Sequence, residues 1–167
     1  MRVVEGRVDI EDVGAFVERL DGVGKTHDVT VQAFDADYVV SRAHLKRAVE
    51  LADRAIERGE NVARDRGVEI LLYAAGVRQI DRALTLGVST GEQRVVVLVD
   101  AADDDEGNEA SAATELAELL TSAETLGTYD EAAVRDYFDI GDDELAVVDG
   151  TLADVVLERV ALLDVEK

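Results

Sequence analysis

The stretch RVVVLVD, residues 94–100, places five consecutive apolar residues between an arginine and an aspartate. Four of the five are valines, whose β-branched side chains pack well on a pleated sheet. A short, unbroken apolar run of this kind is typical of a strand with both faces buried, and it is too short to cross a membrane. We therefore expect residues 94–100 to form a strand that is covered on both sides.

Two further segments carry strand patterns. Residues 3–8 form a short β-like run, and Val29, Val31 and Ala33 alternate with polar residues. With residues 95–99 they predict one mainly antiparallel sheet. The chain has no internal repeat and no linker, so residues 1–167 are expected to form a single α+β domain, with helices packed against a small sheet.

Helical periodicity accounts for most of the remaining chain. The expected helices cover residues 12–20, 41–59, 69–75, 79–86, 112–120, 130–138 and 152–163. Gly22 and Gly24 are expected to end the first helix, and Ser41 and Thr151 stand where N-caps are expected. The acidic run at 103–107 is expected to be a surface loop without a function.

Several kinds of chemistry lack the residues they need. The chain has no cysteine, which excludes disulfides and thiolate sites, and only two histidines. The GKT sequence at 24–26 lacks the first glycine of a phosphate-binding loop, because that position is Arg19. The acidic run cannot be an EF-hand loop, because Ala102 and Ala113 would stand at its first and last positions. No serine lies in a nucleophile-elbow context. We expect no catalytic residue, no metal and no cofactor.

Acidic residues far outnumber basic ones, 38 against 17, which gives a net charge of −21. This composition resembles that of proteins from salt-accumulating archaea, because an acidic surface stays hydrated in molar salt, where the Debye length is only ~3 Å. A mesophilic protein whose acidic surface binds a basic partner is the alternative. The first ten residues lack the apolar core of a signal peptide, so we expect a cytoplasmic location.

Basic residues are concentrated in the middle of the chain. Residues 41–94 contain 10 basic and 8 acidic side chains, whereas residues 95–167 contain 3 basic and 21 acidic ones. A segment that escapes the general acid bias is expected to bind an anion.

Within this segment, the helix over residues 42–58 divides into two lanes at ~100° per residue. The predicted core stripe comprises Leu45, Ala48, Val49, Ala52 and Ile56. A separate lane carries no carboxylates, and two arginines one turn apart, Arg78 and Arg82, follow in the later helices and connections. Arginine binds phosphate oxygens in pairs and stacks on bases, so these side chains are expected to form a nucleic-acid site. The set comprises His44, Arg47, Leu51, Arg54, Arg58, Arg78 and Arg82. The alternative is a solvated helix face with i,i+4 ion pairs.

At these same residues the sequence resembles a known family. The segments SRAHL at 41–45, GVEILLYAAG at 67–76, RQI at 78–80 and LERVALL at 157–163 carry the resemblance. They are similar to the small kinase-associated subunit of the KEOPS complex, the family that includes the p53-related-protein-kinase-binding protein; the acid bias suggests a haloarchaeal member. The resemblance implies a non-enzymatic subunit that binds the complex's atypical kinase. It also implies capture of the 3′ CCA end of tRNA for threonylcarbamoyladenosine formation.

The helix expected at 152–163 is apolar around most of its circumference, more than packing on one side requires. We expect Leu157 and Val160 to contact the kinase, and the alternative is a helix buried from several sides. Two other functions stay open: a protein-only regulatory adaptor of the kinase that does not bind nucleic acid, and a small enzyme that uses His44 as a general base.

Overall fold

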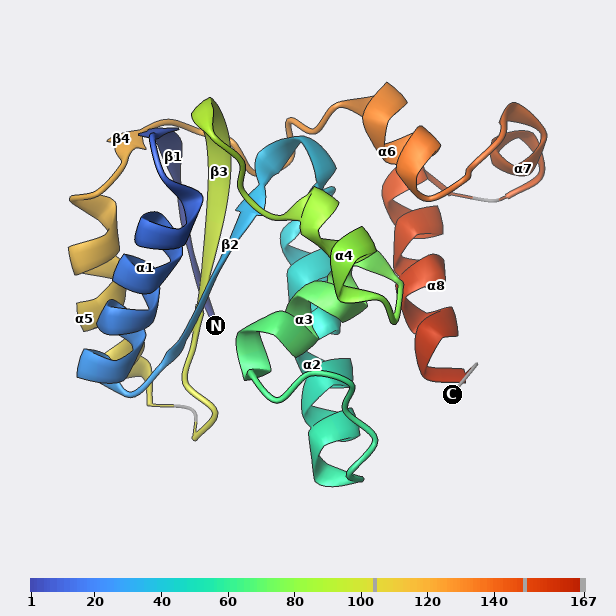
Figure 1. Cartoon of the computed structure of the whole chain (residues 1–167). Helices are drawn as coiled ribbons and strands as arrows, with labels where there is room; N and C mark the ends of the chain where they lie inside the picture. Colours follow the sequence, from blue (N-terminus) through green and yellow to red (C-terminus); the bar gives the residue numbers. More distant parts are fainter. Residues whose placement is uncertain (104, 149, 166–167) are drawn as a thin grey trace.

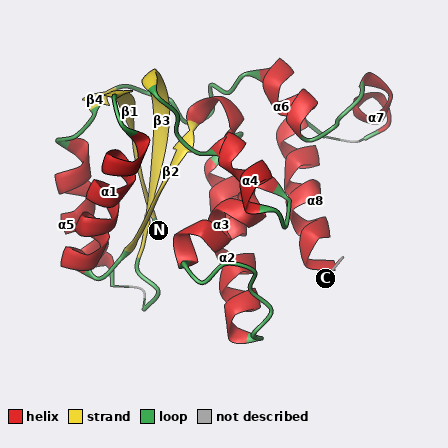
Figure 2. Cartoon of the chain, viewed as in Figure 1, coloured by secondary structure: helices red, strands yellow, loops and turns green. Residues whose placement is uncertain are grey.

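Strand β3, Gly91–Asp100, is a central strand of the sheet. The computed structural model describes residues 1–103, 105–148 and 150–165, without the side chains of 164 and 165. The sheet order is β2-β3-β1-β4, and β3 pairs antiparallel with β1 and β2. This confirms the predicted antiparallel sheet and the α+β class (Figures 1 and 2). The elements are β1 Arg2–Ile10, α1 Val13–His27, β2 Thr30–Asp35, η1 Ala36–Tyr38, α2 Arg42–Glu57, α3 Arg66–Ala75, α4 Ile80–Ala83, η2 Leu84–Leu86, β3, α5 Glu106–Ala117, β4 Thr121–Ser122, α6 Glu131–Tyr137, α7 Asp142–Val147 and α8 Leu152–Val165.

Both faces of β3 are buried, as the sequence predicts. Val95, Val97 and Val99 belong to an apolar cluster with residues of α1 and α5. Val96 and Leu98 belong to a second, larger cluster with residues of α2, α3, α6 and α8. Figure 1 shows α1 and α5 on one side of the sheet and the other helices on the opposite side. The alternation of side chains along one strand therefore divides the core into two halves.

The start of helix α2 and most of its core stripe follow the prediction. Ser41 caps it, because the Ser41 hydroxyl accepts a hydrogen bond from the His44 N–H at 3.2 Å. The side chains of Leu45 and Val49 lie in the same cluster as Val96 and Leu98. Ile56 is 39% exposed, so its place in the core stripe is wrong. The last turn of α2 extends beyond the end of the sheet (Figure 1), and within it Ala55 is buried whereas Ile56 is exposed.

Helix α1 does not end at Gly22 or Gly24, contrary to expectation, but continues to His27. Gly24 is buried, and a Cβ atom there would lie 2.7 Å from the Val29 carbonyl oxygen. The glycine thus allows the helix to approach the chain that leads into β2, and the αL residue Asp28 ends the helix. The GKT sequence at 24–26 therefore belongs to the last turn of α1.

The acidic run is also more ordered than expected. Asp105 caps α5 by accepting from the Asn108 N–H at 3.1 Å, so the helix begins at Glu106. Glu109 is 3% exposed, accepts from the Ala101 N–H at 2.9 Å and pairs with the Met1 ammonium at 3.0 Å. The expectation of a loop is therefore wrong for residues 106 and 107, which belong to α5, whereas the expectation that the segment has no binding or catalytic function stays a prediction. Helix α7 and strand β4 were not expected at all.

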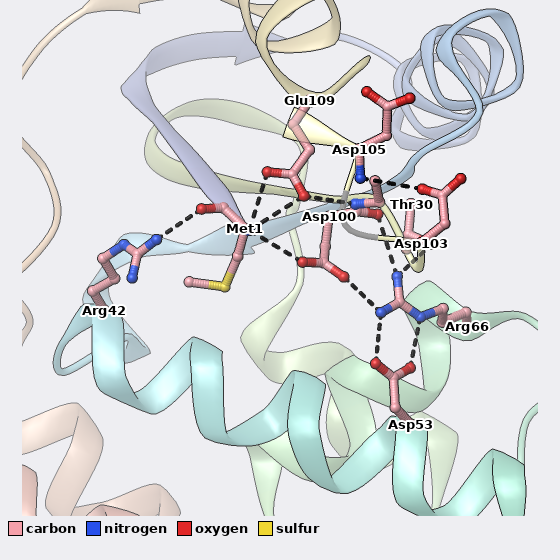
Figure 3. A network of polar contacts seen from close by, with 10 residues as sticks. Met1, Thr30, Arg42, Asp53, Arg66, Asp100, Asp103, Asp105 and Glu109 are labelled. Atoms are coloured by element: carbon pink, nitrogen blue, oxygen red, sulfur yellow. Dashed lines mark hydrogen bonds and ion pairs between the residues drawn. The ribbon is translucent and has the colours of Figure 1, made fainter. Parts of the chain in front are cut away.

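Arg66 joins four elements at one end of the sheet, as Figure 3 shows. Its Nε and one terminal nitrogen each lie 2.8 Å from an oxygen of Asp53, and the same terminal nitrogen lies 2.6 Å from Asp100 Oδ2. Its other terminal nitrogen donates to the Thr30 hydroxyl at 3.0 Å. Burial alone would lower the pKa of Arg66, but the hydrogen bonds to both carboxylates outweigh it and raise that pKa. The guanidinium thereby fastens α2, α3, β2 and β3 together.

We predict that Arg66→Met lowers the free energy of unfolding by about 3 kcal/mol, because it leaves the Asp100 carboxylate largely buried beside fewer partners. Urea denaturation at constant salt measures the loss. The matched control is Arg58→Met: Arg58 is exposed, and its guanidinium makes no hydrogen bond or ion pair with a described residue, so the change should stay within about 0.5 kcal/mol. Equal losses in both variants would contradict the role given to Arg66.

Candidate functional site

The predicted nucleic-acid lane does not form one exposed surface. His44 and Leu51 are 0% exposed and lie in the core, so the prediction is wrong for these two residues. Helix α2 packs against α3 and α8 as well as the sheet side of the core, so its buried arc is wider than a single stripe. A helical projection alone could not reveal the second buried side.

His44 serves the structure. Its Nδ1 accepts from the Val40 N–H at 3.3 Å, and its Nε2–H donates to the Ala74 carbonyl at 2.8 Å. The ring meets Phe138 edge to face, with 6.1 Å between centroids. Burial lowers the pKa of His44 to about 4, despite the opposing effect of the Ala74 hydrogen bond, so the ring is neutral near pH 7. With both nitrogens engaged and no exposed surface, it is not placed to act as a general base on a bound substrate.

The three arginines that the predicted lane places on α2 lie in different surroundings. Arg47 is paired with Glu50 at 3.2 Å, which is the ion-paired helix face that the sequence left as an alternative. Arg54 is half-buried, and Arg58 lies exposed at the C-cap. These three side chains line no common cavity in the described part of the chain.

Arg82, by contrast, is exposed and lines a cavity of about 200 Å³ between α3, α4, α6 and α8, here called the α4–α8 cavity. The cavity is also lined by Gly76, Tyr137, Phe138, Asp139, Arg159 and Leu162. Arg78 is exposed just before α4 and does not line the cavity. Neither the Arg78 nor the Arg82 guanidinium makes a hydrogen bond or ion pair with a described residue. Leu162 is 45% exposed at this cavity. A cation, aromatic rings and an exposed aliphatic side chain are the groups that bind single-stranded nucleic acid.

The aromatic wall of this cavity belongs to a row of rings. Tyr137 meets Tyr38 with 5.8 Å between centroids and Phe138 with 5.1 Å, both edge to face. The Tyr137 hydroxyl donates to the Arg82 carbonyl at 2.9 Å, and burial raises the pKa of this phenol. The row therefore holds α6 against α4 and fixes the cavity wall. Sequence reasoning missed Tyr137 and Phe138, because they lie more than fifty residues from Arg82 and carry no local motif.

The two residues expected to contact the kinase are separated by the structure. Val160 is 0% exposed, so the prediction that it forms a contact surface is wrong; on that side α8 is buried in the core. Leu157 is half-buried and lines a groove of about 350 Å³ with Ala43, Lys46, Arg47 and Glu50, here called the α2–α8 groove. Arg47, expected to bind RNA, and Leu157, expected to bind the kinase, thus share one groove.

Glu69, in the segment at 67–76 that carries part of the family resemblance, has a structural role. It is 1% exposed, and its Oε1 accepts from the Val62 and Ala63 N–H groups, both at 3.0 Å. The carboxylate holds the loop between α2 and α3 against the helix that follows it. Gly76, at φ +66°, ends that helix in the left-handed conformation and also lines the α4–α8 cavity.

Metal clusters and membrane-spanning helices are not found in the described ranges. Among these residues, no group of three His, Asp or Glu side chains could hold a metal ion. None of the described helices is long and apolar enough to cross a membrane.

The fold and these surfaces define a class: a small α+β protein whose ionisable core groups hold the fold together and whose cavities face outward for binding. The model of the family described as kinase binding protein CGI-121 matches residues 8–164. The chain belongs to this family of kinase-binding proteins. A search of the curated proteins found no match.

The depressed pKa of His44 predicts an acid-sensitive fold. Because His44 binds fewer protons in the folded state than in the unfolded state below pH 6.5, its contribution to stability is constant above that pH and decreases as the pH falls toward 4. The His44 contribution to this loss reaches about 3 kcal/mol near pH 4. Urea unfolding at several pH values should show a smaller slope for His44→Gln than for the unchanged chain. Identical slopes for His44→Gln and the unchanged chain would contradict the assignment.

Proposed function

We propose that this chain is a non-enzymatic, cytoplasmic subunit of a KEOPS-type complex that binds the complex's atypical kinase and captures the 3′ CCA end of tRNA for threonylcarbamoyladenosine formation. Membership of a kinase-binding family supports the kinase partner. The α4–α8 cavity, with Arg82 beside Tyr137 and Leu162, is the observation that supports RNA binding.

In this proposal the cavity takes the unpaired end of the RNA. Arg82 at the cavity and Arg78 just before α4 bind phosphate oxygens, because their guanidinium groups have no competing partner among the described residues. The half-buried ring of Tyr137 and the exposed Leu162 pack against bases. Base packing is weakened less by salt than phosphate pairing, which suits a protein with the composition of a salt-adapted archaeon. The chain holds and orients the RNA end, and its partner subunits catalyse the modification of the tRNA.

The kinase contact is proposed at the α2–α8 groove, around Leu157. The groove combines a half-buried leucine with Lys46, Arg47 and Glu50 at its edge. An apolar centre with a charged rim is a common arrangement in protein interfaces. Arg47 is therefore assigned to the kinase surface rather than to the RNA site.

A protein-only adaptor of the kinase is the second candidate. The Arg47–Glu50 pair and the burial of His44 and Leu51 favour it, because they remove three members of the lane that suggested RNA binding. The net charge of −21 also opposes RNA binding at low salt. Direct titration with tRNA separates the two candidates.

For RNA capture, the double variant Arg78→Ala/Arg82→Ala should lose about 2 kcal/mol or more of tRNA binding free energy, the scale of one or two charge-assisted hydrogen bonds. Fluorescence anisotropy with intact tRNA measures the loss. Removal of the CCA end from the tRNA should abolish binding to the unchanged chain, and the affinity should decrease only slowly with salt.

The matched control for this test is Arg54→Ala/Arg58→Ala, which removes the same charge from α2. It should leave tRNA affinity within a factor of two or so of the unchanged chain. If both pairs weaken binding equally, the cavity is not the RNA site. If the unchanged chain does not bind tRNA at all, the protein-only adaptor is the correct function.

For the kinase contact, Leu157→Asp should weaken association with the kinase at least tenfold, because a carboxylate would have to be desolvated in an apolar contact. Leu162→Asp is the matched control, since it places the same charge on α8 but in the α4–α8 cavity. We expect Leu157→Asp to weaken only kinase binding and Leu162→Asp to weaken only tRNA binding, both measured by anisotropy or calorimetry. Kinase binding unaffected by Leu157→Asp would exclude the α2–α8 groove.

A further inference from the structure

A third surface lies away from both of these sites, between α1 and η2. An apolar hollow of about 90 Å³ is lined by Val17 and Leu20 of α1, Leu71 of α3, and Leu84 and Val88. Val17 is 40% exposed and Leu84 is 58% exposed, and both are among the most exposed large apolar side chains of the described residues. We call this feature the α1–η2 hollow. In Figure 1, α1 and α8 lie on opposite sides of the molecule.

The shape and lining of the hollow suit one aliphatic side chain. A dry apolar cavity of ~150 Å³ holds a benzene molecule, so a hollow of this size has room for a branched side chain of a few carbons. Each apolar Å² that is removed from water on binding contributes roughly 25 cal/mol. An inserted side chain would cover Val17 and Leu84, which the chain's own described residues leave uncovered.

A second cavity, of about 360 Å³, adjoins the hollow, and Asp21 and Val31 line both. Its other charged residues are Asp28, Asp65, Lys25 and Arg66. Arg66 is already bound to Asp53 and Asp100, so its charge is balanced outside the cavity. Three carboxylates therefore line the cavity against one lysine, and one of them, Asp65, also caps α3 by accepting from the Val68 N–H at 3.0 Å. We call this feature the acidic cavity.

The shifted pKa of Asp21 agrees with the excess of carboxylates over lysine in the acidic cavity. Burial raises the pKa of Asp21, and the Asp65 carboxylate raises it further, while Lys25 only partly opposes them. Asp21 makes no hydrogen bond or ion pair with another described residue. A positive group that entered the acidic cavity would be attracted by all three carboxylates.

We propose that the α1–η2 hollow and the acidic cavity together bind a segment of a partner protein that carries an aliphatic side chain next to an arginine or lysine. The aliphatic side chain fills the hollow, and the cation pairs with Asp21 and its neighbours. Nucleic acid does not fit this site, because the three carboxylates repel phosphate. The surface is separate from the RNA cavity and the kinase groove, so this inference goes beyond the proposed function.

The proposal also gives a place to the GKT sequence at 24–26. Lys25 lines the acidic cavity from the last turn of α1, where the Thr26 hydroxyl donates to the Gly22 carbonyl at 2.9 Å. The segment is therefore part of the wall of a peptide site and not a phosphate-binding loop.

Synthetic peptides test the proposal on the full chain. The probe is an acetylated, amidated hexapeptide AALRAA, with AALEAA and AAARAA as controls that reverse the charge or remove the aliphatic side chain. In an NMR titration of the ¹⁵N-labelled protein, we expect AALRAA to shift the amides of Val17, Asp21, Lys25 and Leu84 saturably. Both control peptides should bind at least tenfold more weakly.

Variants test the location of the site. Leu84→Asp and Asp21→Lys should each weaken AALRAA binding at least tenfold, and both positions are exposed, so the fold should persist. The matched controls Leu162→Asp and Asp143→Lys, at exposed positions on α8 and α7, should leave peptide binding unchanged. Asp21→Lys should also keep the tRNA and kinase affinities of the unchanged chain, which separates a failure here from a failure of the proposed function.

Three results would overturn the proposal. The first is the absence of saturable shifts with AALRAA in the unchanged chain, a result that does not depend on any variant. The second is equal binding of AALRAA and AALEAA. The third is saturable shifts of the same amides by a single-stranded RNA oligonucleotide, which would mean that the site serves nucleic acid.

Discussion

The structure depends on the burial of both faces of β3. Because successive side chains of a strand point to opposite sides, Val95, Val97 and Val99 require one covering layer, and Val96 and Leu98 require another. Helices α1 and α5 supply the first layer, and α2, α3 and α8 supply the second. The Arg66 network fixes the second layer to the end of the sheet (Figure 3). The outer sides of α1, α4 and α8 are then left to face solvent, and all three candidate binding surfaces lie there.

The polar groups in the core have structural roles, so only the exposed groups remain for binding. His44 bridges the segment before α2 and the end of α3, and Glu69 holds the α2–α3 loop. Buried polar groups that are fully hydrogen-bonded stabilise one conformation, whereas a group that acts on a substrate must be accessible to it. The accessible groups are arginines, an aromatic wall and scattered aliphatic side chains. Side chains of these three kinds commonly form the binding surfaces of proteins.

The sequence predicts those features that a single segment determines. The three main strands follow from valine-rich runs and alternation, and the start of α2 follows from Ser41, whose hydroxyl caps the next turn. Features that depend on packing against an element distant in the sequence cannot be predicted from one segment alone. His44 and Val160 are buried because their helices are packed on more than one side, and Gly24 is fixed by the approach of Val29. The cavity beside Arg82 depends on Tyr137, whose position only the tertiary fold defines.

The central claim is that one small scaffold holds the kinase and the RNA end on separate surfaces, with α8 between them. Mass photometry of the chain, its kinase partner and intact tRNA, mixed at concentrations above both dissociation constants, measures this directly. The account predicts a ternary complex of one chain, one kinase and one tRNA, in which neither ligand displaces the other. Mutually exclusive binary complexes of the chain, with kinase or with tRNA but never with both, would contradict it.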